Sequence, residues 1–241
     1  MTNDNKLNSP SEPLDGSGQM FDKIAKRYDL LNRILSIGQD QHWRRAQIEK
    51  LAISGGPANV LDLATGTADV ALQIAYRYPQ ATIIGVDPSL AMLEIGRKKI
   101  KNAGLENRIN LIAGDAQDLQ FADASFDAVC MSFGIRNVPN RQKALAEIAR
   151  VTRKDGKVLI LELAKTQQGR LAKLAQLYLR YIIPGIGGLL AGAHEYKYLR
   201  DSIATFPGAD KFAQMMQTAG LHITAIEHFC FGVVHLFIAE K

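Results

Sequence analysis

The stretch Asn59–Asp87, NVLDLATGTADVALQIAYRYPQATIIGVD, decides the fold. An apolar run ends at Leu63, a turn of small residues covers 64–68, and a second apolar run ends on Asp87. In an open α/β sheet, a strand, a tight turn, a helix and a second strand with an acidic end bind a nucleoside. The turn lies under the ligand, and the carboxylate lies at the ribose hydroxyls. The segment therefore predicts a nucleoside site but does not say which nucleoside.

The turn itself disfavours a dinucleotide. NAD and FAD sites use a glycine-rich turn that closes on a pyrophosphate at a helix N-terminus. Here the small residues are Ala64, Gly66 and Ala68, and Asp69 follows them. A carboxylate suits the positive end of a helix but repels a diphosphate. S-adenosylmethionine has no phosphate and carries two cationic groups, so it fits. A purely structural turn and a nucleotide-dependent oxidoreductase remain the alternatives.

Composition sets outer limits. A chain of 241 residues with 47% hydrophobic content can bury one large core, so one domain is expected. The net charge of +5 favours an anionic surface, such as nucleic acid or acidic lipid, without requiring either. Cys130 and Cys230 lack metal-ligand spacing, which indicates reduced core residues in a cytoplasmic protein and no metal site. Residues 1–18 are polar and predict a disordered tail, without a signal peptide or membrane span.

Strand-like and helix-like segments alternate along residues 19–241, the predicted domain. Strands are expected at 60–63, 83–86, 109–113, 128–132 and 158–163, and helices at 20–28, 40–51, 70–77, 88–101, 141–152 and 211–218. This alternation predicts a mostly parallel sheet with helices on both faces, preceded by a helical cap over 19–56. Two closely spaced runs, 221–229 and 232–239, predict an antiparallel hairpin at the sheet edge.

The ligand of such a sheet lies over the carboxyl ends of the strands. The residues that follow the five parallel strands are Thr65–Asp69, Asp87, Asp115 with Ala116, Ser132–Asn137, and Glu162. Most of these ends carry an acidic residue, which favours a cationic ligand over a phosphate. The alternative is that the Asp and Ser residues only cap the helices that follow.

Several motifs resemble one family. The segments are FDKIAKRYDLLNRILSIGQDQHWRR from Phe21, LDLATGTADVA from Leu61, SFGIRNV from Ser132 and YKYLRDSIATFP from Tyr196. They are similar to the UbiE/MenG family of class I S-adenosylmethionine-dependent C-methyltransferases of quinone biosynthesis, over nearly the whole chain after the tail. The resemblance implies a class I methyltransferase (Rossmann-like) fold, with a mostly parallel seven-stranded sheet. One departure is Ala68, where many members have glycine.

The resemblance also implies cofactor contacts. They fall at Thr67, Asp87, Asp115, Ala116 and Ser132. Asp87 can accept hydrogen bonds from both ribose hydroxyls and Asp115 from the adenine amino group, while the two hydroxyl side chains can bond the methionine portion.

The implied reaction is transfer of a methyl group to a ring carbon of a polyprenylated hydroquinone, converting demethylmenaquinol to menaquinol. The benzoquinol step of ubiquinone biosynthesis is the nearest alternative. Arg136 and Asn137 follow the fourth strand and are the predicted catalytic residues. Because the pKa of arginine exceeds about 12, Arg136 is expected to orient a water or to stabilise a developing phenolate. The alternative is a structural clamp on neighbouring carbonyls.

A lid is predicted over residues 170–207. Its stretch Leu171–Leu190 is apolar but interrupted by charges and glycines, so a spanning helix is disfavoured. It is expected to cover the prenyl tail of a lipid quinol and to touch the inner face of the cytoplasmic membrane, or else to be an ordinary core helix. A basic stripe with interleaved aromatics is missing, so a nucleic-acid partner is not expected. The oligomeric state stays open, with a homodimer as one alternative.

Overall fold

A computed structural model describes residues 17–53, 56–164 and 193–241. The strands are β1 (Ala58–Leu63), β2 (Ala81–Asp87), β3 (Ile109–Ala113), β4 (Phe126–Ser132), β5 (Thr152–Leu163), β6 (His222–Phe229) and β7 (Val234–Glu240). The α-helices are α1 (Ser17–Leu35), α2 (Gln39–Glu49), α3 (Asp69–Arg77), α4 (Leu90–Asn102), α5 (Arg141–Val151), α8 (Ala193–Thr205) and α9 (Ala209–Thr218), and η1 (Ile135–Asn137) and η3 (Cys230–Gly232) are short 3-10 helices.

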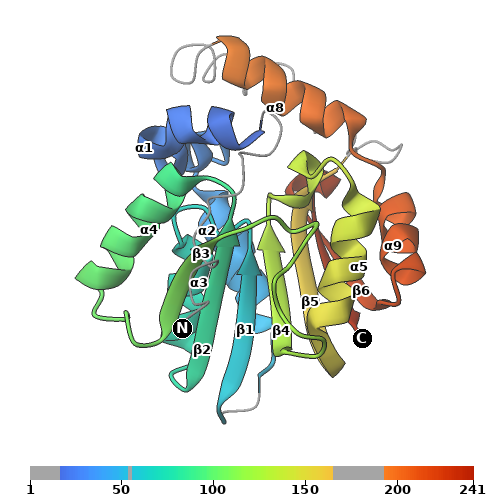
Figure 1. Cartoon of the computed structure of the whole chain (residues 1–241). Helices are drawn as coiled ribbons and strands as arrows, with labels where there is room; N and C mark the ends of the chain where they lie inside the picture. Colours follow the sequence, from blue (N-terminus) through green and yellow to red (C-terminus); the bar gives the residue numbers. More distant parts are fainter. Residues whose placement is uncertain (1–16, 54–55, 165–192) are drawn as a thin grey trace, which may run out of the picture.

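The seven strands form one sheet in the order β3-β2-β1-β4-β5-β7-β6 (Figure 1). Strands β1 to β5 pair in parallel, and β7 pairs antiparallel with both β5 and β6. The predicted mostly parallel sheet with a C-terminal antiparallel hairpin is therefore confirmed. Its edge strand is β6, because β7 lies between β5 and β6.

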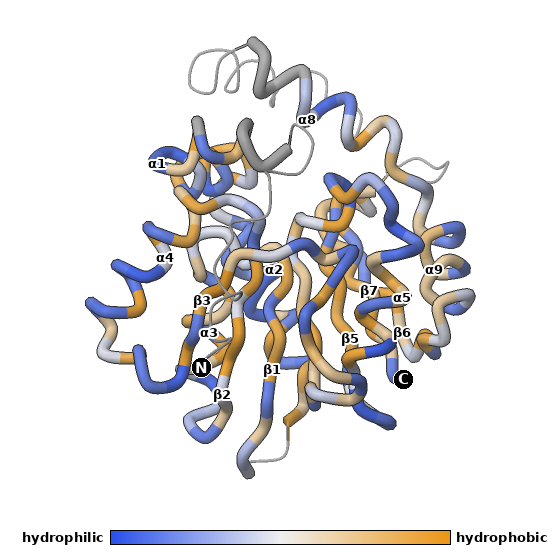
Figure 2. Tube along the Cα trace, viewed as in Figure 1, coloured by the Kyte–Doolittle hydropathy of each residue, from blue (hydrophilic) through white to orange (hydrophobic). Residues whose placement is uncertain are grey.

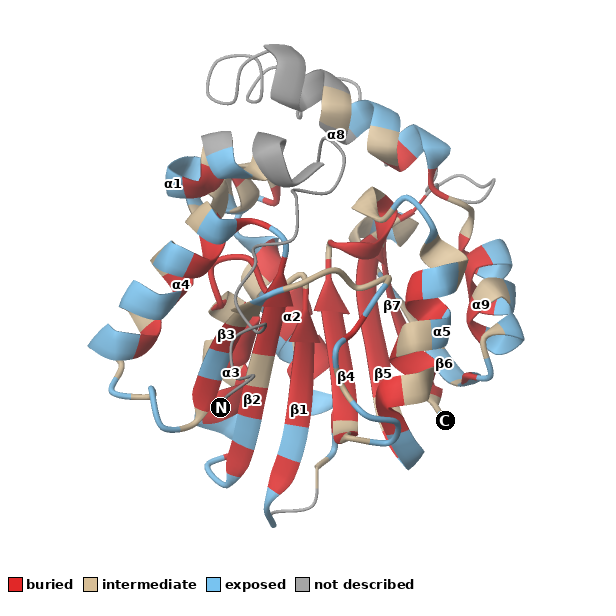
Figure 3. Cartoon of the chain, viewed as in Figure 1, coloured by how far each residue is buried: buried red, intermediate tan, exposed pale blue. Residues whose placement is uncertain are grey.

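Two hydrophobic cores flank the sheet. Successive residues of β1 point to opposite faces, so Val60 belongs to the core under α2, α3 and α4, whereas Leu61 belongs to the core under α5 and α9. The central strands are correspondingly apolar along their length (Figure 2) and buried on both faces (Figure 3). This packing fixes the strand ends at which a ligand would lie.

Capping residues set the helix ends more sharply than periodicity did. Helix α4 begins at Leu90, two positions after the predicted Pro88, because the Ser89 hydroxyl accepts a hydrogen bond from the Met92 amide at 3.2 Å and caps the helix. The helix is closed by Gly104, whose φ of +66° is the left-handed conformation that glycine adopts freely.

Helices α1 and α8 lie beyond the carboxyl ends of the parallel strands (Figure 1). Helix α1 extends to Leu35, beyond the predicted end near Tyr28, while α2 packs against a face of the sheet. Residues 1–16 of the predicted tail and the stretch Leu171–Leu190 of the predicted lid lie outside the described residues. Among the described helices, none is long and apolar enough to cross a bilayer.

Candidate active site

A cavity of about 310 Å³ lies at the carboxyl ends of β1 to β4. Its lining contains five of the predicted site residues: Asp87, Asp115, Ala116, Ser132 and Asn137. The volume is at the lower end of the range for small-molecule sites. The two predicted residues that do not line this cavity are Thr67 and Arg136.

The floor of the cavity is the turn after β1. Ala64 and Gly66 have φ values of +52° and +55°, in the left-handed region, and both line the cavity. Small side chains are needed here because the segment after β4 packs directly against the turn. A Cβ added to Gly134, beyond the end of β4, would lie 2.4 Å from the Ala64 Cβ. The turn and the end of β4 are therefore locked together.

Asp87, the last residue of β2, is held from two sides. Its Oδ2 accepts a hydrogen bond from the Gly66 amide and its Oδ1 one from the Ser89 amide, each at 2.9 Å. Burial raises its pKa from 3.8 to about 6, although the two amide bonds lower it, and the charge of Asp22 raises it further. Each oxygen keeps a free lone pair, as binding of two ribose hydroxyls requires.

Asp115 and Ala116 follow β3 on the other side of Asp87. Both oxygens of Asp115 bind Gln117, one accepting from its backbone amide at 3.0 Å and the other from its side-chain amide at 2.8 Å. The carboxylate is thereby oriented at the cavity wall, where an adenine amino group could donate to it.

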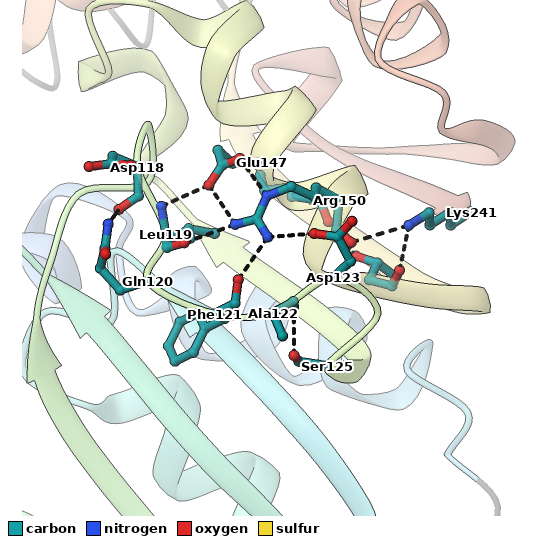
Figure 4. A network of polar contacts seen from close by, with 12 residues as sticks. Asp118, Leu119, Gln120, Phe121, Ala122, Asp123, Ser125, Glu147, Arg150 and Lys241 are labelled. Atoms are coloured by element: carbon teal, nitrogen blue, oxygen red, sulfur yellow. Dashed lines mark hydrogen bonds and ion pairs between the residues drawn. The ribbon is translucent and has the colours of Figure 1, made fainter.

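The chain after Asp115 is anchored by Arg150 of α5 (Figure 4). The guanidinium donates to the carbonyls of Leu119 at 2.8 Å and Phe121 at 2.7 Å, and it pairs with Glu147 and Asp123. Glu147 in turn accepts from the Leu119 amide at 2.8 Å. This network fixes the β3–β4 connection that carries Asp115 and Ala116 at the cavity wall.

Aromatic residues of α1 line the cavity from above. Phe21 and Tyr28 both belong to the lining, and their ring centroids are 5.9 Å apart. The Phe21 ring also contacts that of Tyr198 in α8, with centroids 6.5 Å apart. The Tyr198 hydroxyl donates to Asn137 Oδ1 at 3.1 Å. Neither aromatic of α1 was among the predicted site residues, although both lie in the FDKIAKRYDLLN motif.

Arg136 is buried beside Glu162 rather than in this cavity. Its Nη1 donates to Glu162 Oε1 at 2.8 Å and to the Phe133 carbonyl at 2.6 Å, and its backbone amide donates to Glu162 Oε2 at 3.1 Å. Burial is the largest single influence and lowers the pKa of Arg136, but the charge and hydrogen bond of Glu162 together with Tyr28 and Tyr198 raise it by more, so the pKa lies above its usual value. The Nε of Arg136 has no hydrogen-bond partner among the described residues. Arg136 lines a second, smaller cavity.

Thr67 and Asp69 bind Lys99 instead of facing the cavity. Lys99 Nζ donates to Thr67 Oγ1 at 3.0 Å, to Asp69 Oδ1 at 2.5 Å and to Asp29 Oδ2 at 2.6 Å. The Thr67 hydroxyl donates to Asp29 Oδ1 at 2.7 Å. The expectation that Asp69 lies beside a cationic ligand is therefore wrong, because α4 brings a lysine to it.

Asp62 is a buried acid that the sequence did not single out. Burial raises its pKa from 3.8 to about 7, while the hydrogen bond from the Thr65 hydroxyl, at 2.7 Å, lowers it. Its second oxygen, Oδ1, has no partner among the described residues. The sequence signal that could have identified Asp62 is an acidic residue inside the apolar run of β1.

A model of the ubiE/COQ5 methyltransferase family matches residues 12–241. The chain belongs to the ubiE/COQ5 methyltransferase family. The methyltransferase is 41% identical over 231 residues to the "Ubiquinone/menaquinone biosynthesis C-methyltransferase UbiE" of Syntrophotalea carbinolica, covering 96% of each chain. It is 39% identical to the "Demethylmenaquinone methyltransferase" of Thermus thermophilus, covering 92% of this chain and all of that protein. A SAM-dependent methyltransferase from Aquifex aeolicus shares the fold, with a TM-score of 0.63 at 14% identity over 90% of this chain and 97% of that one.

The cavity suits S-adenosylmethionine, the cofactor expected from the sequence. The charged residues of its lining in the described part of the chain are Asp87 and Asp115, with no Lys, Arg or His among them. A diphosphate would find no counter-charge there, whereas a sulfonium and an ammonium would. The acidic lining of the cavity therefore argues against a dinucleotide more directly than Asp69 does, because Asp69 is not part of that lining.

Proposed function

We propose that this methyltransferase methylates a ring carbon of a polyprenylated hydroquinone and converts demethylmenaquinol to menaquinol. The observation that carries the proposal is the similarity, over more than nine-tenths of the chain, to proteins named for menaquinone and ubiquinone biosynthesis. The benzoquinol step of ubiquinone biosynthesis is kept as the second candidate because the Syntrophotalea carbinolica relative is named for both quinones.

In this proposal, bound S-adenosylmethionine supplies an electrophilic methyl group. The protein must hold the acceptor ring in line with it and stabilise the negative charge that develops on a ring oxygen. Asn137 lies on the cavity wall, and its amide is held from two sides, because its side-chain oxygen accepts from the Tyr198 hydroxyl at 3.1 Å and its Nδ2 donates to the Phe133 carbonyl at 3.5 Å. We assign Asn137 and Tyr198 to contact with the ring.

We assign Arg136 a positioning role. Its Nη1 already binds the Phe133 carbonyl and Glu162, which fixes the turn that carries Phe133 and Asn137 into the cavity wall. Arg136→Gln leaves Glu162 buried with its charge unpaired, which costs on the order of 3–5 kcal/mol. The double variant Arg136→Gln/Glu162→Gln removes both charges. Recovery of turnover in the double variant supports the positioning role, whereas continued loss would favour direct stabilisation of a phenolate.

The substrate is tested with purified enzyme, S-adenosylmethionine and short-chain demethylmenaquinol, beside the matching demethylated benzoquinol. Methyl transfer to the naphthoquinol, detected by mass, with at most slow transfer to the benzoquinol, is the expected result. Preference for the benzoquinol would select the second candidate. Accumulation of demethylmenaquinone in cells that lack the gene provides the matching test in vivo.

We further propose that the enzyme contacts the membrane peripherally when it takes up its lipid substrate. The support is the net charge of +5 and the apolar, interrupted stretch 171–190, which lies outside the described residues. Co-sedimentation with anionic vesicles, but not with neutral ones, is expected. Failure to bind vesicles of either kind would refute this part of the proposal.

A further inference from the structure

Gln47 of α2 is a buried polar residue that bonds the end of β4. Its side chain is fully buried, and its Nε2 donates to the Leu159 carbonyl at 3.0 Å and to the Met131 carbonyl at 3.3 Å. Its Oε1 accepts the hydroxyl hydrogen of Ser132 at 2.6 Å. Gln47 does not line the cofactor cavity, but Ser132 does.

These contacts fix the orientation of the amide. Turning it over would place Oε1 against two carbonyl oxygens and leave buried acceptors facing one another, which is costly in a dry interior. With Nε2 committed to the two carbonyls, Oε1 must face Ser132. A hydroxyl has a single hydrogen, and that of Ser132 is donated to Gln47 Oε1. Ser132 therefore presents only lone pairs to the cavity and can accept, but not donate, a hydrogen bond there.

The place of Ser132 along the cavity indicates its partner. The sheet order puts Asp115 at the end of β3 and Asp87 at the end of β2, so the nucleoside occupies that side of β1. Ser132 lies on the opposite side, at the end of β4, where the methionine portion must extend. That portion carries an ammonium group, a donor, and a carboxylate, an acceptor. An acceptor-only hydroxyl matches the ammonium and not the carboxylate.

We propose that Gln47 is a positioning residue that holds Ser132 as a hydrogen-bond acceptor for the ammonium group of S-adenosylmethionine. The readout is calorimetric affinity for S-adenosylhomocysteine compared with its analogue that lacks the amino group. Hydrogen bonds to charged groups contribute about 1.5–3 kcal/mol, so Ser132→Ala should weaken binding of S-adenosylhomocysteine roughly 10-fold to 150-fold. Binding of the deaminated analogue should change little.

Gln47→Met, whose thioether is only a weak hydrogen-bond acceptor, frees the Ser132 hydrogen and should likewise reduce discrimination between the two ligands. Ser132→Thr keeps the hydroxyl and should preserve it. Asp87→Asn is the matched control, since its ribose contacts are common to both ligands and both affinities should fall together. If Gln47→Met does not fold, Ser132→Ala still tests the ammonium contact. Equal losses for both ligands in the Ser132→Ala and Gln47→Met variants would overturn the proposal.

Discussion

Acidification should weaken cofactor binding through Asp87. Asp87 is 7% exposed as a whole residue, and burial raises the pKa of its carboxyl group to about 6. Only the ionised form can keep both amide hydrogen bonds and accept from two ribose hydroxyls, because a protonated carboxyl gives up an acceptor position to its own hydrogen. Ligand binding therefore favours the ionised form and lowers the pKa in the complex. Affinity must fall as pH drops through the pKa of the free enzyme.

The size of the effect follows from the ionised fraction. With a pKa of about 6, roughly ten-elevenths of the molecules are ionised at pH 7 and about one-eleventh at pH 5. The Kd for S-adenosylhomocysteine should therefore rise about tenfold between these pH values, equivalent to about 1.4 kcal/mol. The stability of the ligand-free protein changes in the opposite direction. Because the pKa of Asp87 is raised on folding, its contribution to the free energy of unfolding is lost as pH rises from 3.8 through 6.

Calorimetric titration from pH 5 to pH 7 measures this dependence. Asp87→Asn binds more weakly but should lack the tenfold change, and it reports any titration of the ligand itself. Asp62→Asn is the second control, because Asp62 has a pKa of about 7 and could add a slope nearer neutrality. A wild-type Kd that varies less than about twofold would refute the argument, as would an equal slope in Asp87→Asn.

Three further outcomes are expected. In the wild type, the raised pKa of Asp62 should lower the free energy of unfolding by roughly 3 kcal/mol as pH rises from 5 to 8, and Asp62→Asn should not show this decrease. Equal decreases in both proteins, measured by chemical denaturation, would contradict this. Gly134→Ala should cost about 1–3 kcal/mol of stability and weaken S-adenosylhomocysteine binding, because its Cβ would force Ala64 away; an unchanged Tm and Kd would count against the tight packing. Tyr198→Phe removes a hydrogen bond to Asn137 worth about 1 kcal/mol and should reduce kcat/KM for the quinol about fivefold; a changed cofactor Kd with normal turnover would argue against the assignment to the ring.

Much of the fold could be predicted because it depends on local patterns. The apolar runs of β1 and β2 separate two hydrophobic cores, and runs of that kind are visible in sequence. The strand-end rule brought Asp87, Asp115 and Ser132 to one cavity for the same reason, since parallel strands all end at one edge.

The partners of the side chains could not be predicted in this way. Asp69 faces Lys99, which lies 30 positions later in the chain, and Arg136 pairs with Glu162, 26 positions away. Gln47 reaches Ser132 across 85 positions. Such contacts depend on how whole helices pack against the sheet, and a sequence without aligned relatives carries no local signal for them.

The position of β7 has a consequence for the order of folding. Strands β1 to β5 can pair in parallel as soon as β5 has been synthesised, but the outer edge of β5 then exposes unpaired amides and carbonyls from Lys157 to Leu163. In the described part of the chain, the strand that covers this edge is β7, which follows β6 in the sequence but lies between β5 and β6 in the sheet. Until Val234–Glu240 is available, β5 is an open edge of the kind that pairs with other chains. Pairing of the last strand with β5 therefore removes an edge to which other chains could pair.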